Sequence, residues 1–399
     1  MRRFLNFLKK VLTNGGLFLL VGVLTYRMVF AGSDFRLVLR HAAQSHVVFL
    51  LCGGAMIVLM LCAETVTVGR NLRLLEETQS FHQCLIYTFA GNFFSAITPA
   101  ATGGQPMEVY LMHKKGVSVV HGTLALIMDL ACYQISTTLL GIIGYVSFGP
   151  LIHSLLGRFI WLLWLGLVLN TGLLILLLFA MFSRRFIFRL TAFAVGLIAF
   201  FSKDRADAFK HSTETAIAQY RTGAAMFLQN KRYFLVNCLI TILRILAMHS
   251  APFWVYQALG LSGASLVQII AFQSALYISC AALPFPGGIG IAERSFLHYF
   301  KTIFPGTLLQ SSMILSRGIG SYMTIILSGG VLAVIFFLSM FQSKRRACKR
   351  KEAAHETSIQ SNGHGSHGSS RSGRSCLSDQ FPDAAERIHR KRSLYGGSG

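Results

Sequence analysis

Two stretches of the sequence decide the fold: NFFSAITPAATGGQPME at residues 92–108 and LPFPGGIGIAER at residues 283–294. Proline interrupts a helix, and paired glycines allow positive φ or a close backbone approach, so each stretch predicts a helix that breaks inside an apolar segment. An acidic residue, Glu108 or Glu293, follows each glycine pair. A proline kink with glycine packing is the alternative for either break alone. Matching breaks in two halves of a chain are typical of a transport site near the middle of a membrane.

The composition favours a membrane protein. The chain has 399 residues, of which 53% are hydrophobic and only 13% charged. It contains 37 Lys and Arg but only 15 Asp and Glu, which gives a formal net charge of +22. A nucleic-acid-binding protein needs more polar surface than this, and a disordered chain has less apolar content. The eight cysteines form no CxxC pair, so neither a zinc site nor a disulfide framework is indicated.

Six apolar segments are long enough to cross a hydrocarbon core of about 30 Å: Gly15–Phe30, Val47–Val68, Val119–Phe148, Phe159–Phe182, Tyr233–Gln257 and Gly318–Phe341. Lys and Arg concentrate on cytoplasmic loops. Their positions put both flanks of residues 82–116 inside and both flanks of residues 265–311 outside. The two broken segments therefore enter from opposite faces, as in an inverted repeat. The alternative is eight full spans.

We predict an all-α polytopic membrane protein with about six full spans and two oppositely oriented broken or re-entrant helical hairpins. Residues 1–341 are expected to form the membrane domain, with a cytoplasmic amphipathic loop at 183–232. Residues 342–399 are rich in Ser, Gly, His and basic residues and predict a disordered cytoplasmic tail. Both termini are then cytoplasmic.

Ionisable side chains inside spans are costly, so they face the protein interior or pair with one another. Asp129 and Arg244 lie near the middle of predicted spans, and we expect them to form a polar cluster with Arg317 that binds a lipid phosphate. Glu64 lies near a predicted span end, where it is expected to reach the interface. The predicted substrate-binding residues come from the spans and the two breaks: Asn92, Thr98, Gly103, Gly104, Gln105, Asp129, Arg244, Pro286, Gly287, Gly288, Glu293 and Arg317.

No catalytic residue, metal ligand or cofactor site is predicted. The sequence contains no GxxxxGK[ST], HExxH or GxSxG motif. The longest predicted cytoplasmic piece, 183–232, is too short for a catalytic domain.

The residues at both breaks carry a resemblance to a known family. Asn92, Thr98-Pro99, Gly103-Gly104-Gln105-Pro106 and the later Pro284-x-Pro286-Gly287-Gly288-x-Gly290-x-x-Glu293 resemble the lysylphosphatidylglycerol synthase transmembrane (flippase-like) family, over about residues 10–341. Its bifunctional members, the phosphatidylglycerol lysyltransferases, join a lipid-flipping membrane part to a cytoplasmic domain that moves lysine from lysyl-tRNA to phosphatidylglycerol. The resemblance implies a role in bacterial resistance to cationic peptides.

The resemblance implies a multi-pass protein of the bacterial cell (inner) membrane that binds and translocates an anionic or aminoacylated phospholipid, or another lipid-linked anionic substrate. The alternative is the membrane part of a phosphatidylglycerol lysyltransferase that works with a separate synthase subunit, and a third is a scaffold for lipid or wall synthesis. We expect no transferase chemistry from this chain alone, because only residues 342–399 follow Phe341. No cofactor and no direct nucleic-acid partner are expected, and homo-oligomerisation stays open.

Overall fold

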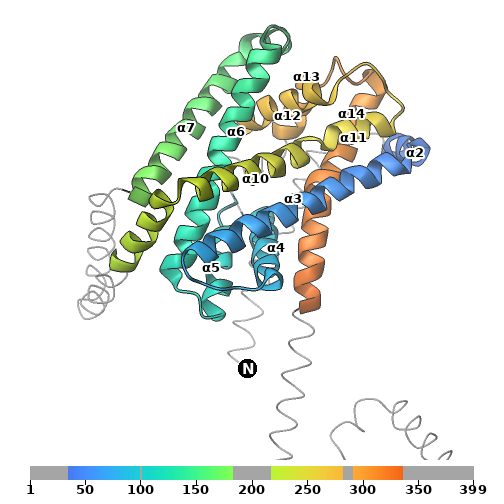
Figure 1. Ribbon diagram of the computed structural model, residues 1–399. Helices are drawn as coiled ribbons and strands as arrows, with labels where there is room; N and C mark the ends of the chain where they lie inside the picture. The colour runs from blue at the N-terminus through green and yellow to red at the C-terminus, as the bar shows by residue number, and fades with distance from the viewer. Residues whose placement is uncertain (1–34, 99–100, 183–216, 282–290, 336–399) are drawn as a thin grey trace, which may run out of the picture. The chain divides into compact units, whose positions relative to one another are not determined.

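The computed structural model of the protein describes residues 35–98, 101–182, 217–281 and 291–335 (Figure 1). These residues are 88% helical and contain no strand. Among them, five helices are long and apolar enough to cross a membrane: Val47–Leu74, Val119–Leu156, Ile160–Met181, Lys231–Ala258 and Gly306–Ile335. The predicted all-α polytopic class is thereby confirmed. The predicted span Gly15–Phe30 and tail 342–399 lie outside the described residues.

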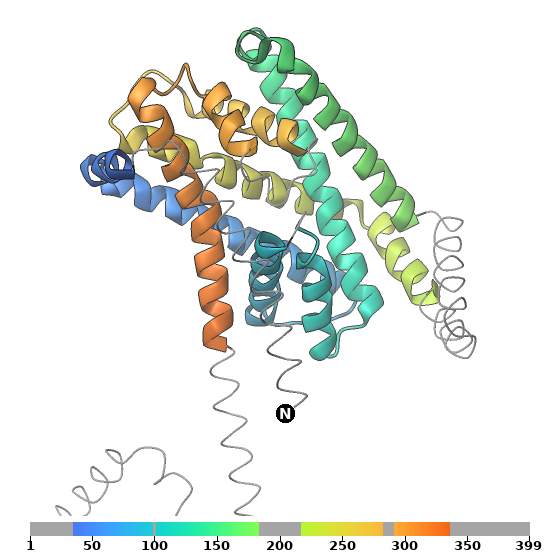
Figure 2. The ribbon, with the colours of Figure 1, turned by 180° about the vertical axis from the view of Figure 1, so that it is seen from behind.

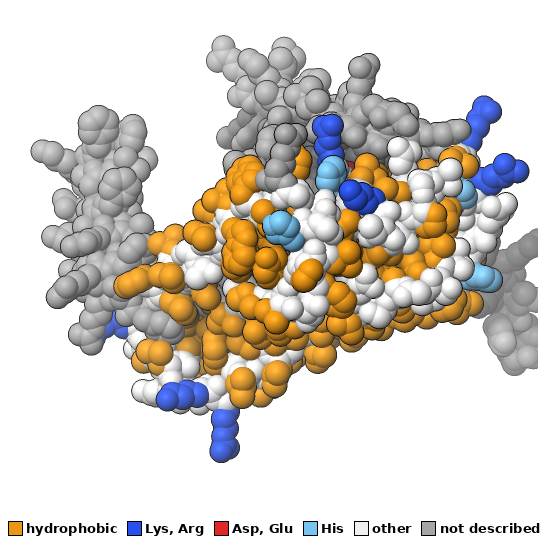
Figure 3. All heavy atoms as spheres, turned by 90° about the horizontal axis from the view of Figure 1, so that it is seen from above, with side chains coloured by type: hydrophobic (Ala, Val, Ile, Leu, Met, Phe, Trp, Pro, Cys, Tyr) orange, Lys and Arg blue, Asp and Glu red, His pale blue; other side chains and the backbone are white. Residues whose placement is uncertain are grey.

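The surface of the spans is apolar. Val146 is 77% exposed, Ile326 71% and Leu51 68%, and many other large aliphatic side chains are similarly open. Figure 3, which looks down on the upper part of Figure 1, shows hydrophobic side chains over much of that face, with Lys, Arg and His side chains at separate points. Exposed apolar surface of this extent marks an interaction face, which for such helices is the hydrocarbon of a bilayer.

The first half of the described chain consists of a span, a hairpin and two further spans: α2 (Phe35–Gln44), α3 (Val47–Leu74), α4 (Phe81–Ile97), α5 (Gly104–Lys114), α6 (Val119–Leu156), the 3₁₀ turn η2 (Gly157–Phe159) and α7 (Ile160–Phe182). A capping box begins α4: the Ser80 hydroxyl accepts from the Gln83 N–H, and the Gln83 side chain accepts from the Ser80 N–H. The helix stops at Ile97, just before Pro99, because the residue before a proline disfavours helical backbone.

The second half repeats the order of span, hairpin and span. A helix at 217–229 precedes α10 (Lys231–His249), α11 (Ala251–Ala258), α12 (Leu266–Ala281), α13 (Ile291–Tyr299), α14 (Gly306–Arg317), the π-helical turn η4 (Gly318–Tyr322) and a helix at 323–335. The last span begins at Gly306, so the prediction that it begins at Gly318 is wrong. Pro305 is extended and starts the helix, whereas Gly318 keeps helical dihedrals and only widens the turn.

One end of the bundle, here called the Glu77 end, gathers the loops on both sides of the first hairpin. The Glu77 carboxylate accepts a hydrogen bond from the Ser118 N–H at 3.1 Å and lies 2.9 Å from His121 Nδ1. The Tyr220 hydroxyl donates to the Ala180 carbonyl at 2.8 Å, which brings the end of α7 to the helix 217–229. The α4–α5 hairpin thus starts and finishes at the Glu77 end.

The opposite end, called the His41 end, gathers the loops around the second hairpin. His41 Nδ1 lies 2.8 Å from Ser311 Oγ, and the His46 N–H donates to the Ala258 carbonyl at 2.8 Å. The rings of Phe159 and His298 meet edge to face, which brings the α6–α7 turn to α13. The α12–α13 hairpin therefore starts and finishes at the His41 end, opposite to the end at which the α4–α5 hairpin starts and finishes.

The contacts between the two halves are also related by this reversal of direction. Figures 1 and 2 show α3 and α10 running beside each other, and these are the spans that precede the two hairpins. The span that follows each hairpin meets the hairpin of the other half: α6 packs along α12, and Gly329 lies against the ring of Phe93 on α4. Span, hairpin and span therefore occur twice with opposite direction.

A close helix contact fixes α7 against α12. A Cβ at Gly166 would overlap the Ile278 carbonyl oxygen and come within 2.7 Å of its carbonyl carbon. We expect Gly166→Ala to lower the free energy of unfolding by about 1–3 kcal/mol, because backbone on both sides must shift. Tryptophan fluorescence during thermal unfolding of the purified protein in detergent measures this loss.

Gly172→Ala on the same helix is the matched control, since a Cβ there meets no atom within 4 Å. Alanine favours helix over glycine, so this variant should unfold at the wild-type temperature or slightly above it. Equal unfolding temperatures for the two variants would contradict the contact between α7 and α12.

Candidate functional site

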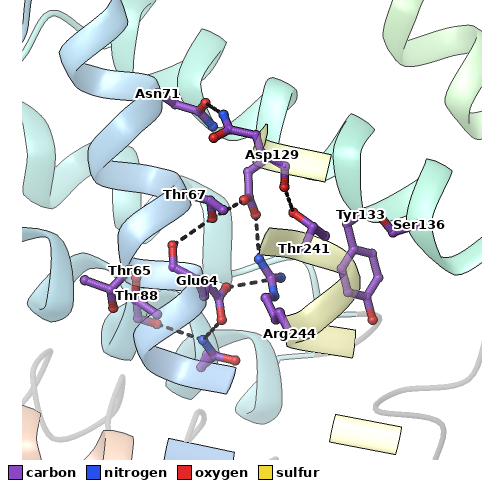
Figure 4. A network of polar contacts seen from close by, with 12 residues as sticks. Glu64, Thr65, Thr67, Asn71, Thr88, Asp129, Tyr133, Ser136, Thr241 and Arg244 are labelled. Carbon is purple, nitrogen blue, oxygen red and sulfur yellow. Dashed lines mark hydrogen bonds and ion pairs between the residues drawn. The ribbon is translucent and has the colours of Figure 1, made fainter. Parts of the chain in front are cut away.

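The centre of the site is the guanidinium of Arg244 on α10 (Figure 4). Its Nη1 donates to Asp129 Oδ2 on α6 at 3.0 Å, and its Nη2 lies 3.5 Å from Glu64 Oε1 on α3. The side chain of Arg244 is 11% exposed, and those of Asp129 and Glu64 are 12% and 15% exposed. One cation thus joins three spans through two carboxylates away from solvent.

Neutral donors occupy the remaining carboxylate oxygens. The Thr67 hydroxyl donates to Asp129 Oδ1 at 2.6 Å, and the Asn92 amide donates to Glu64 Oε2 at 3.0 Å. The ring of Tyr133 lies below the guanidinium, with 5.1 Å between Arg244 Cζ and the ring centroid. Buried charges are stable only when their hydrogen-bonding capacity is filled in this way.

An amide chain continues from this cluster toward the Glu77 end. The Asn237 amide donates to Asn71 Oδ1 at 2.6 Å, and Arg70 Nε donates to Asn237 Oδ1 at 2.8 Å. The Asn71 amide in turn donates to the Ala125 carbonyl at 3.0 Å. Polar contacts between α3, α6 and α10 therefore extend from the interior to a basic residue near the loops.

The predicted residues of the first break build a tight turn. The Thr98 hydroxyl donates to the Phe94 carbonyl at 2.6 Å and accepts from the Gly103 N–H at 2.9 Å, so it closes the gap between α4 and α5. A Cβ at Gly104 would lie 2.6 Å from the Gly91 carbonyl, which explains the requirement for glycine. Gln105 is exposed in the first turn of α5.

Glu108 lies one turn further along α5, and its residue is only 7% exposed. The carboxylate rests against Gly91 of α4, where a Cβ would overlap it. Gly91 precedes Asn92, the donor to Glu64. Glu108 follows the glycine pair in the sequence but is not among the predicted site residues.

The second hairpin carries a separate ion pair. Arg317 Nε lies 3.2 Å from Glu293 Oε1, and Arg317 Nη1 donates to Ser321 Oγ in the π-helical turn at 3.4 Å. The Arg317 side chain is 25% exposed and that of Glu293 7% exposed. Pro286, Gly287 and Gly288, which we predict to complete this hairpin's site, lie outside the described residues.

The structure divides the predicted charged cluster in two. Asp129 pairs with Arg244, whereas Arg317 pairs with Glu293 of its own hairpin. Glu64, expected to reach the interface, is instead a member of the buried cluster. α3 continues to Leu74, so Glu64 lies in its interior and not near its end.

An apolar pocket of about 290 Å³ opens between α6, α7 and α12. Its lining includes Gly141, Ile142, Tyr145, Trp164, Leu167 and Ile278. The hydroxyl of Tyr277, the residue before Ile278, accepts a hydrogen bond from Tyr133 at 2.9 Å. The charged cluster and the apolar pocket are thus linked through α12.

The described residues contain no group of three or more His, Cys, Asp and Glu side chains that could hold a metal ion. Nothing in those residues therefore suggests a metal centre at either ion pair.

Fold and site together define a polytopic helical membrane protein with buried charged side chains beside two helical hairpins. A family model described as the lysylphosphatidylglycerol synthase TM region matches residues 14–329, so the chain belongs to this family. The resemblance found at the two breaks is thereby confirmed. No curated protein matches the chain.

The pairing geometry predicts the cost of removing Arg244. We expect Arg244→Gln to lower the free energy of unfolding by about 3–5 kcal/mol, because two buried carboxylates lose their common cation. Unfolding in mixed detergent micelles measures the loss. Adding Glu64→Gln and Asp129→Asn to the same chain should restore part of it, because the buried groups are then neutral.

Arg317→Gln is the comparison, since Arg317 is more exposed and serves one carboxylate. Arg317→Gln should lower the free energy of unfolding clearly less than Arg244→Gln does. An equal loss for both arginines, or no recovery in the triple variant, would contradict the assignment of Arg244 as the common partner.

Proposed function

We propose that the protein binds a phospholipid with its headgroup beside the two hairpins and moves it between the leaflets of a bilayer. The observation that carries the proposal is the buried Arg244–Asp129–Glu64 cluster next to a helix break inside apolar spans. Charged side chains within membrane spans are expensive and usually mark substrate or ion pathways. Membership of the lysylphosphatidylglycerol synthase TM family supports a lipid as the substrate.

The two charged groups suit different parts of a headgroup. Arg317 is partly exposed, and a phosphate could exchange with Glu293 for its guanidinium. The cluster around Arg244 contains more carboxylates than cations, which favours an ammonium group over a second anion. An anionic or aminoacylated phospholipid carries the groups required for one or both positions.

The acyl chain also has a candidate place. The apolar pocket between α6, α7 and α12 adjoins exposed Ile142 and Val146, which face the hydrocarbon. A chain lying there would gain dispersion contacts with aliphatic and aromatic side chains, because packing and not removal from water drives association within the hydrocarbon. Tyr277 connects this pocket to the charged cluster.

The proposed setting is a bacterial inner membrane with the Glu77 end in the cytoplasm. Basic side chains flank the hairpin and spans at that end: Arg70, Arg73, Lys114, Lys115, Arg221, Lys231 and Arg232. Lys and Arg near the ends of spans favour the cytoplasmic side. Cytoplasmic chain termini follow from the same argument applied to the sequence.

Reconstitution tests the proposed function. The purified full chain is placed in vesicles of phosphatidylethanolamine and phosphatidylglycerol with a trace of fluorescent phosphatidylglycerol, and the leaflet exchange of the probe is followed by quenching from outside. We expect wild-type protein to accelerate exchange and Arg317→Ala to reduce the rate at least about tenfold, which corresponds to about 1.4 kcal/mol of lost interaction.

Lys301→Ala, which removes an exposed cation at the His41 end, should exchange lipid at the wild-type rate. A wild-type rate for Arg317→Ala, with intact folding, would overturn the headgroup role of Arg317. Lipid extracts from cells without the protein separate translocation from a lysyltransferase role: normal amounts of aminoacylated lipid with altered leaflet exposure support translocation, and loss of that lipid contradicts it.

A further inference from the structure

The carboxylates around Arg244 outnumber the available positive charge. Glu64 and Asp129 share the guanidinium, and a third carboxyl, that of Glu108, lies against Gly91, next to the Asn92 that donates to Glu64. Within the described residues, Glu108 has no hydrogen bond or ion pair, although it is only 7% exposed.

The helices that pack against α5 offer Glu108 no free cation. On α4, the Asn92 amide donates to Glu64 and to the Thr88 carbonyl, each at 3.0 Å, and the Tyr87 hydroxyl donates to Gln79. The other titratable side chains of α4 are His82, which is exposed, and Cys84, which is buried in an apolar cluster. On α6, Asp129 faces this region, while His121 is paired with Glu77 at the Glu77 end.

The network nevertheless contains unused hydrogen-bonding capacity. The Thr88 hydroxyl, one turn before Asn92, is buried and has no partner among the described residues (Figure 4). An ionised Glu108 without a partner, beside two other carboxylates, would cost several kcal/mol in such an environment. A protonated carboxyl removes both the desolvation cost and the repulsion.

We propose that Glu108 is a proton-binding site within the membrane and that its protonation is coupled to lipid translocation; the coupling rests on the proposed function. Proton binding converts the carboxylate to a neutral acid and leaves Glu64 and Asp129 as the ionised partners of Arg244. Glu108 lies one turn from exposed Gln105 at the first break, so the path from the surface of the protein to the carboxyl is short.

Infrared difference spectroscopy of the full chain in vesicles tests proton binding directly. We expect the C=O stretching band of a protonated carboxyl in wild-type protein near neutral pH and its loss in Glu108→Gln, which has the shape of the protonated acid and should fold normally. Glu76→Gln, at an exposed loop position, is the matched control and should retain the band. Absence of the band from wild-type protein, or its persistence in Glu108→Gln, overturns the proposal.

An imposed pH gradient across the same vesicles tests the coupling. One coupled proton per lipid changes the equilibrium leaflet ratio of fluorescent phosphatidylglycerol by up to about tenfold for each pH unit. Wild-type protein should show this shift and Glu108→Gln should not. If wild-type protein translocates no lipid at all, the proposed function fails while the infrared test of Glu108 still stands. Lipid exchange in wild-type protein that ignores the gradient overturns the coupling.

Discussion

The guanidinium of Arg244 lies inside an apolar bundle with its side chain 11% exposed, and removing such an ion from water has a large free-energy cost. The cost is offset only because α3 and α6 each present a carboxylate at hydrogen-bonding distance and Tyr133 presents its ring. The three spans must therefore keep one register relative to each other. The position of the first hairpin follows, because Asn92 of α4 completes the coordination of Glu64.

Around this fixed point the chain builds the same unit twice in opposite directions. Each hairpin is packed by the closing span of the other half, so neither half has a complete interior alone. The two halves differ in charge, however. The first surrounds its break with an acidic excess shared by several helices, whereas the second balances Glu293 with Arg317 of the next helix. A lipid moved along the proposed pathway would therefore meet an acidic excess beside one hairpin and a balanced ion pair beside the other.

Much of the architecture could be predicted from the sequence, because proline and glycine act locally. Pro99 and the pair Gly103-Gly104 end one helix and begin another wherever they lie in space, and basic loop residues indicate which segments return to the same end. Gly318 shows the limit of this reasoning: the sequence pattern predicts the start of a span at this glycine, but the backbone continues through it as a π-helical turn.

The charged pairs could not be predicted, because partner choice depends on which helices become neighbours. The first hairpin and the spans α6 and α7 lie between Glu64 and Arg244 in the sequence, and nothing local favours their pairing over that of Arg244 with Glu293. The contact of Gly91 with Glu108 has a consequence for the evolution of the family. Any relative with a side chain at position 91 must shorten or redirect the residue at position 108, so these two positions should vary together across homologous sequences.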